Sequence, residues 1–126
     1  MKRLVICAGI LIFLLAATLV NSWALERTSN RLSDLLEQAE SLAESGDWAQ
    51  AEALTLQAQQ SWTDASDYLY IVLRHSDTDQ VDTGFREVLE LLRCRESGEY
   101  SSVNARLTAQ IRLLSEMEQF TLKNLL

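Results

Sequence analysis

The 126-residue chain changes its hydrophobic pattern once, near residue 25. Residues 4–20 form an unbroken apolar run, whereas farther along the chain apolar residues recur every three or four positions among polar ones. An unbroken run suits a helix surrounded by lipid, and helical spacing suits helices that bury one face. The chain also has no proline, the strongest helix breaker. The sequence therefore predicts a membrane segment followed by an all-α domain.

The apolar run is long enough to be a transmembrane helix. Residues 4–20 cover about 25 Å as a helix, and residues 21–25 extend it to roughly the 30 Å of a bilayer core. Lys2 and Arg3 precede the run, and nothing beyond it is comparably basic. Since basic flanks stay in the cytoplasm, we expect a single-pass membrane protein with a cytoplasmic N-terminus and an extracytoplasmic C-terminal domain.

A cleaved secretory signal is the alternative interpretation of this segment. It too has a basic start and an apolar centre, and the Ser-Trp-Ala triplet at 22–24 resembles a cleavage site. Signal cores usually have about 7–15 apolar residues, fewer than this run, so a retained anchor is favoured. Trp23 suits the boundary between lipid headgroups and water. We therefore divide the chain into an anchor, residues 1–25, and a helical-bundle domain, residues 26–126.

The spacing of apolar residues in the domain predicts four helices. Nothing breaks the helix after the apolar run, so the first bundle helix is expected to continue directly from the anchor. The second is expected from Asp47 to about Arg74, the third from 76–79 to Ser97, and the fourth after Gly98. Each carries an apolar stripe that needs a partner. Paired in sequence order, they predict two antiparallel hairpins that form a four-helix bundle.

A glycine, an acid and an aromatic residue recur at the two expected corners. They are Gly46, Asp47 and Trp48 in the first hairpin, and Gly98, Glu99 and Tyr100, 52 residues later, in the second. The glycine closes one helix in the left-handed conformation, the acid caps the next helix, and the ring pins the two together. This corner is similar to the turn of tetratricopeptide repeats (TPR), where a glycine, an aromatic residue and an alanine mark the same position.

Several segments together resemble a known family. They are the basic and apolar start, the glycine-acid-tryptophan hairpin, the stretch VLRHSDTDQVD and the ending TLKNLL. They are similar to an uncharacterised family of small membrane-anchored helical proteins of Gram-positive spore formers, catalogued as a domain of unknown function. In that family a histidine precedes an acid by four residues, and a Leu-x-Asn-Ile-Leu ending recurs. The matching positions are His75, Asp79, Leu122, Asn124 and Leu126, with Leu125 in place of the isoleucine. The resemblance implies the topology and adds no activity.

Charge and cysteine content restrict the possible partners. The part beyond the apolar run holds nine basic and 18 acidic residues, which gives it a net charge of −9. Such a surface repels nucleic acid and anionic lipid headgroups, so neither is expected as a partner. Cys7 lies in the apolar run and Cys94 lies far along a helical segment, so we expect both thiols to be unbridged.

The only histidine, His75, is the centre of any histidine-based site. Asp79 follows by four residues, so a helix through both places them on one face, where the carboxylate can orient the imidazole. We interpret them, together with Asn124, as a structural corner with a possible function. The run DTDQVD lacks the glycine and the closing glutamate of a calcium loop, and no cysteine is near enough for zinc.

Two other groups of residues have a structural interpretation. The carboxylates Glu37, Glu40, Glu44 and Glu52 lack the Glu-x-x-His step of a bundle metal site and are interpreted as a solvated face. The aromatic residues Trp48, Trp62, Tyr68 and Tyr70 have helical spacing among alanines and are interpreted as core. No phosphate loop or nucleophile elbow occurs. The sequence thus predicts no enzyme, no metal and no cofactor.

Two functions fit this architecture. The first is a protein-protein interaction or scaffold module that docks an unknown protein partner in the groove between the hairpins. The second is a ligand-sensing bundle with a small-molecule site between the hairpins near His75. An exposed groove favours docking, and an enclosed cavity with convergent polar groups favours ligand sensing.

Overall fold

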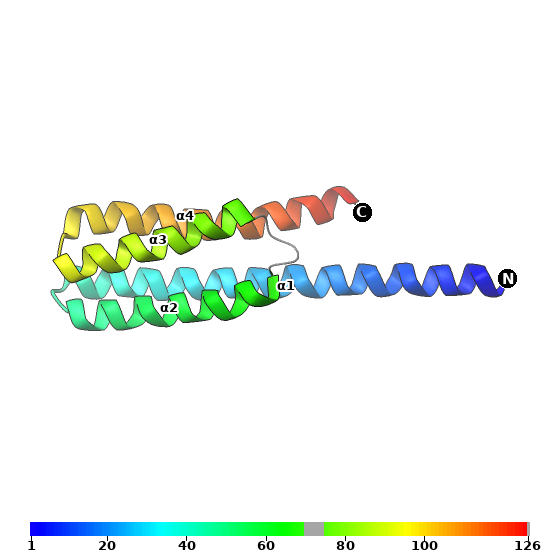
Figure 1. Ribbon diagram of the computed structural model, residues 1–126, viewed down its shortest axis with the longest axis horizontal. Coiled ribbons are helices and arrows are strands. Elements are labelled where there is room, and N and C mark those ends of the chain that lie inside the picture. The colour runs from blue at the N-terminus through cyan, green and yellow to red at the C-terminus, as the bar shows by residue number, and fades with distance from the viewer. Residues whose placement is uncertain (70–74, 126) are drawn as a thin grey trace.

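In the computed structural model, the described residues form four helices and no strand (Figure 1). The structure describes the backbone of residues 1–69 and 75–125, and their side chains except those of residues 68, 69, 75–77, 118, 121, 122 and 125. The helices are α1 (Lys2–Glu44), α2 (Trp48–Leu69), α3 (His75–Cys94) and α4 (Ser97–Leu125). The prediction of an all-α chain is confirmed. Residues 70–74, expected to complete the second helix, lie outside the described residues.

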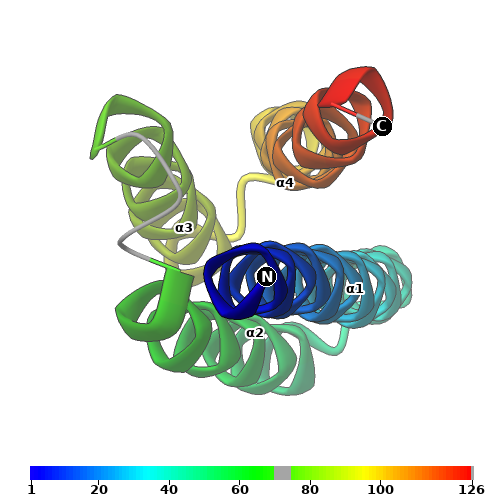
Figure 2. The ribbon, with the colours of Figure 1, turned by 90° about the vertical axis from the view of Figure 1, so that its right-hand side faces the viewer.

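The four helices pack side by side as a bundle (Figure 2). Each helix contacts its neighbours in the sequence, and α4 also packs against α1. The chain direction alternates, so both helix corners lie at one end and the C-terminal end of α4 lies at the other (Figure 1). Helix α1 is 43 residues long, and its N-terminal half projects from the bundle (Figure 1).

Helix α1 passes from the projecting half into the bundle without a break. Every side chain from Met1 to Val20 is exposed, and burial begins at Ser22 and Leu25. The described structure has one helix, α1, that is long and apolar enough to cross a membrane. The expected boundary between residues 25 and 26 therefore lies inside a continuous helix.

The core runs along the centre of the bundle and is built by all four helices. Its apolar members include Leu32, Leu36 and Ala39 of α1, Ala51, Ala58 and Trp62 of α2, Val81, Phe85, Val88 and Leu92 of α3, and Leu107 and Ile111 of α4. These residues lie three, four or seven positions apart within each helix, which places them on one face. The alanines let neighbouring helices approach closely, and the tryptophan fills a wider space. Trp62 is therefore a core residue, as the sequence predicts.

The first corner follows the sequence pattern. Gly46 has a φ of 89°, the left-handed region where glycine has no steric penalty. Its N–H donates to the carbonyl of Ala43, and the N–H of Asp47 donates to the carbonyl of Leu42, which is the Schellman arrangement at a helix end. The carboxylate of Asp47 then accepts a 3.2 Å hydrogen bond from the backbone N–H of Gln50 and so caps α2.

The second corner has the same geometry but at other residues. Here Arg95, with a φ of 55°, takes the left-handed position. Its N–H donates to Leu92, and the N–H of Glu96 donates to Leu91. The expectation that Gly98 closes the helix is wrong, because Gly98 lies in the first turn of α4. Arg95 is thus the counterpart of Gly46, and the two corners correspond at a spacing of 49 residues, three fewer than the sequence repeat suggests.

Because Arg95, and not Gly98, takes the left-handed position, we can predict the sign of the stability change for substitutions at Arg95, Gly98 and Gly46. Arg95→Gly should raise the free energy of unfolding by about 1 kcal/mol, because a left-handed conformation costs a side-chain-bearing residue about that much. Gly98→Ala should also stabilise the protein, by up to about 1 kcal/mol, because alanine suits a helix better. Gly46→Ala, the matched control, should destabilise it by a similar amount. Thermal unfolding of the three variants measures the signs, and a loss of stability in Gly98→Ala would contradict the assignment.

Candidate functional site: the groove between α1 and α4

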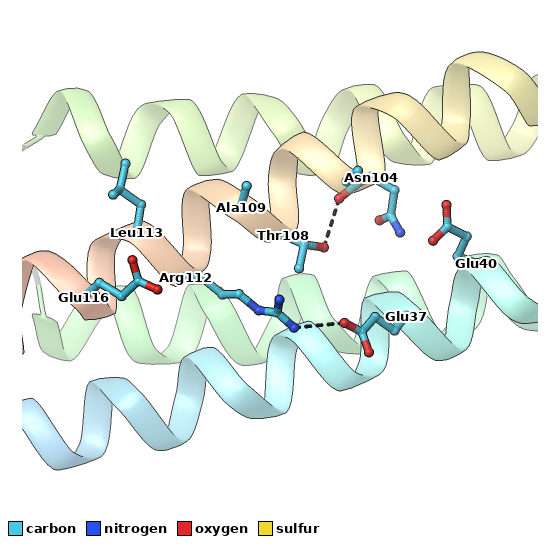
Figure 3. A pocket seen from close by; sticks show the side chains of 9 residues that line it. Glu37, Glu40, Asn104, Thr108, Ala109, Arg112, Leu113 and Glu116 are labelled. Atoms are coloured by element: carbon cyan, nitrogen blue, oxygen red, sulfur yellow. Dashed lines mark hydrogen bonds and ion pairs between the residues drawn. The ribbon is translucent and has the colours of Figure 1, made fainter.

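A surface groove of about 560 Å³ follows the contact between α1 and α4 (Figure 3). These helices belong to different hairpins, so the groove lies between the hairpins. Its residues are Glu37 and Glu40 of α1, and Asn104, Ala105, Thr108, Ala109, Arg112, Leu113 and Glu116 of α4. They recur at helical spacing on the two facing sides, so the groove runs along the helix axes.

The rim of the groove is acidic. Three carboxylates, those of Glu37, Glu40 and Glu116, face a single guanidinium, that of Arg112. Arg112 pairs with Glu37 at 2.9 Å, but both side chains are more than half exposed, so this ion pair contributes less than about 1 kcal/mol. Glu40 accepts a 2.5 Å hydrogen bond from the Ser101 hydroxyl. The groove therefore favours a ligand with positive charge.

Below the rim, the α1–α4 contact is polar. The Nδ2 of Asn104 donates to the carbonyl of Leu36 at 3.1 Å, and the Ser29 hydroxyl donates to the carbonyl of Ile111 at 3.4 Å. Asn104 is only 2 % exposed, and its Oδ1 has no hydrogen-bond partner among the described residues, nor does the buried hydroxyl of Ser33. An unpaired buried polar atom costs about 1–3 kcal/mol. The contact between α1 and α4 is thus weakened by buried polar atoms that have no partner among the described residues.

Tyr100 connects this contact to the first corner. Its buried ring meets the ring of Trp48 edge to face, with centroids 6.4 Å apart and planes at 67°. The aromatic residues of the two corners thus touch, although they are not equivalent positions. Its hydroxyl has no hydrogen-bond partner among the described residues. Burial, together with the charges of Glu40 and Glu44, raises the pKa of Tyr100 far above its ordinary value.

The raised pKa predicts an alkaline loss of stability. The folded protein keeps the Tyr100 proton to higher pH than the unfolded chain, whose tyrosine pKa is about 10. Stability is therefore unaffected by this group below about pH 10 and falls above it, by up to about 1.4 kcal/mol per pH unit. Tyr100→Phe should remove that fall, and near neutral pH it should leave stability unchanged or raise it by up to about 1 kcal/mol. Urea unfolding at about pH 8 and pH 11 compares the two proteins; an equal alkaline loss in both would contradict the prediction.

The residues around the only histidine lie away from the groove. His75 begins α3, but its side chain lies outside the described residues, as do those of Leu122, Leu125 and Leu126. Asp79 is exposed, one turn farther along α3, and borders a smaller hollow between α3 and α4. Asn124 is exposed near the end of α4. The interpretation of His75, Asp79 and Asn124 as a corner stays a prediction.

A groove between the hairpins is expected from the sequence, but the residues that line it were not identified there, although a signal was present. Tyr100, Asn104, Leu107, Ile111 and Leu114 alternate by four and three residues, the spacing of a buried face, and all five are buried. An asparagine inside such a series marks a polar contact between helices. Val103, the apolar residue next to Asn104, is only partly buried.

The structure also describes the two cysteines and the four carboxylates that the sequence analysis singles out. Cys7 and Cys94 are both free thiols, as expected. Of the four carboxylates interpreted as a solvated face, Glu37 and Glu44 are exposed and Glu40 and Glu52 are partly buried, Glu52 in a 3.0 Å ion pair with Arg93. Within the described residues, no group of three or more histidine, cysteine or acidic side chains could hold a metal ion.

Comparison with known proteins gives one match. The model of the family DUF4363, a domain of unknown function, matches residues 19–125. The match covers the bundle part of α1, the whole of α2 and α3, and all of α4. No curated protein matches the chain, and no solved structure does. The membrane anchoring, the source in Gram-positive spore formers and the TPR-like character of the corners stay predictions.

Proposed function

Because the chain belongs to the DUF4363 family, a domain of unknown function, we propose its role from its own geometry: it is a membrane-anchored module that docks a protein partner in the α1–α4 groove. One observation carries this proposal. A single helix, α1, carries the exposed apolar stretch in its first half and one wall of the groove in its second. A partner held in the groove is thereby held at a fixed height above the membrane.

The anchor is supported by exposure and continuity. No other helix of the bundle buries the side chains of Met1 to Val20. Their apolar surface is therefore available to lipid. Cleavage after the Ser-Trp-Ala triplet would cut α1 between Ser22 and Leu25, two residues that the bundle buries. A retained helix avoids that loss. The basic pair Lys2 and Arg3 favours an extracytoplasmic bundle.

The partner is a helical segment that carries lysine or arginine. The groove is open and elongated, which suits a helix better than a small molecule. Its carboxylates complement positive charge, and Leu113, which is 53 % exposed at one end, offers an apolar contact. Ligand sensing near His75 is the second candidate; no described contact favours it over docking.

Site-specific photocrosslinking tests the docking. A photoreactive amino acid at Ala109, inside the groove, and one at Gln57, an exposed position on α2, are compared in full-length protein in its native membrane. We expect one protein to be captured from Ala109 and not from Gln57, through a basic segment. Glu40→Lys should reduce that capture several-fold, and Glu90→Lys, on the exposed surface of α3, should not. Equal capture from both positions, or none from Ala109, would reject the proposal.

Membrane anchoring is tested independently of docking. The intact protein should remain in the membrane pellet after carbonate extraction, and its mature N-terminus should precede residue 4. A mature chain that begins near Leu25 and is released by carbonate would show a cleaved signal instead. Protease added to intact spheroplasts should digest the bundle if its orientation is extracytoplasmic.

A further inference from the structure

The acidic residues of α1 and α4 stop within about one helical turn of the same height. The first acid of α1 is Glu26 and the last acid of α4 is Glu118, so residues 1–25 and 119–126 contain none. The described parts of these two segments, residues 1–25 and 119–125, lie at the same end of the bundle (Figure 1). Elsewhere the bundle is strongly acidic, so this end differs from the rest in its surface chemistry.

The pairing of the two helices fixes their relative heights. Asn104 is hydrogen-bonded to Leu36, and Ser29 is hydrogen-bonded to Ile111. In both pairs the two residue numbers add up to 140, so residues of α1 and α4 whose numbers have this sum lie at about the same height. Because α1 and α4 are antiparallel, Phe120 lies about level with Val20, and Asn124 about level with Ala16. The end of α4 therefore extends along the uncharged stretch of α1, as Figure 1 shows for the C-terminal end beside the projecting helix.

The side chains of this end are those of a membrane interface. Phe120 is 67 % exposed, and Trp23 of α1 is also exposed at nearly the same height. Lys123, the only charged residue in 119–126, is exposed, and its long side chain can extend from the end of α4 toward the headgroups. Aromatic and basic residues are enriched where a membrane meets water. If the bilayer core ends near Leu25, Phe120 lies about 7–8 Å inside that boundary, the depth of an interfacial helix.

From this geometry we propose that the last two turns of α4 insert into the outer part of the bilayer, so that the bundle contacts lipid at α4 as well as α1. The occupant of this surface is zwitterionic lipid, because the acidic bundle repels anionic headgroups. Two contacts at different points fix the orientation of the bundle on the membrane, whereas α1 alone leaves it free to rotate. This inference rests on the anchor proposed above.

Accessibility of single labels in vesicles tests the contact. In full-length protein with Cys7→Ser and Cys94→Ser, a cysteine replaces Phe120, Leu113 or Phe13, and each carries the fluorophore NBD. The vesicles are phosphatidylcholine. Leu113 is the matched control, because it is similarly exposed on α4 but level with Arg27, outside the expected membrane. The label at 120 should be quenched by shallow spin-labelled lipid, and dithionite added outside should reduce it several-fold more slowly than the label at 113.

The three positions separate the possible failures. If the label at 120 reacts as fast as that at 113 while the label at 13 is protected, the α4 contact is wrong and the anchor stands. If the label at 13 also reacts as in water, the anchor and the α4 contact both fail. Circular dichroism of each labelled protein confirms that it is folded, which is expected because Phe120 and Leu113 are exposed.

Discussion

Trp62→Ala should lower the free energy of unfolding by about 3–5 kcal/mol, the largest effect expected of any single substitution in the bundle. Trp62 is 1 % exposed and is the largest of the fully buried side chains. Its removal leaves a cavity at the centre of the bundle, and alanine cannot fill it. The indole Nε1 also donates a 2.8 Å hydrogen bond to the Asp82 carboxylate, which connects α2 to α3. Trp62→Ala therefore removes both the packing of the ring and the hydrogen bond between α2 and α3.

Two control variants separate these contributions. Trp62→Phe keeps most of the ring volume and loses the N–H donor, so it should cost less, about 1–2 kcal/mol. Trp48→Ala removes a half-buried ring at the first corner and should also cost less than Trp62→Ala. Urea unfolding of the full-length protein in detergent, followed by circular dichroism, provides the comparison. A Trp62→Ala protein within about 1 kcal/mol of the wild type would contradict the position of Trp62 at the centre of the core.

Leu107→Ala should cost about 2–5 kcal/mol, because Leu107 is a fully buried member of the core on α4. Its effect is coupled to Gly84 on α3. A β-carbon added to Gly84 would lie only 2.8 Å from Leu107 Cδ1, so α3 and α4 approach closely there. In the wild type, Gly84→Ala should therefore destabilise the protein by about 1–3 kcal/mol through overpacking.

A double-mutant cycle tests this coupling. In the Leu107→Ala background the obstructing methyl is absent, so Gly84→Ala should stabilise the protein by about 1 kcal/mol through its helix propensity. Gly98→Ala is the control, since a β-carbon at Gly98 meets nothing within 4 Å and should have the same effect in both backgrounds. Equal effects of Gly84→Ala with and without Leu107 would show that the two helices do not meet as described.

Much of the fold could be predicted from local patterns. The spacing of Leu32, Leu36 and Ala39, and that of Ala51, Ala58 and Trp62, identifies buried faces because a helix repeats every 3.6 residues. The first corner could also be predicted, since Gly46 and Asp47 have the preferences that its conformation requires. In each case the physical cause lies within a few residues of the chain.

The second corner shows where local patterns mislead. The stretch at 96–100 resembles that at 44–48, yet the left-handed residue that closes α3 is Arg95, three residues before the position that the resemblance suggests. The helix ends where the apolar face of α3 ends against the core, after Leu92. Arg95 then takes the left-handed conformation despite its side chain. Packing of a whole helix outweighs the preference of one glycine, which is worth only about 1 kcal/mol.

The sequence by itself determined that the chain is helical, which faces of the helices are buried, and that one segment is long and apolar enough to span a membrane. These properties follow from short-range periodicity and composition. Only the tertiary structure decided that α1 and α4 adjoin, that Asn104 is buried at their contact, and that Phe120 lies about level with Val20. These contacts join residues about 60 to 100 positions apart in the chain. The relative height of α1 and α4 depends on how the side chains of all four helices pack in the common core.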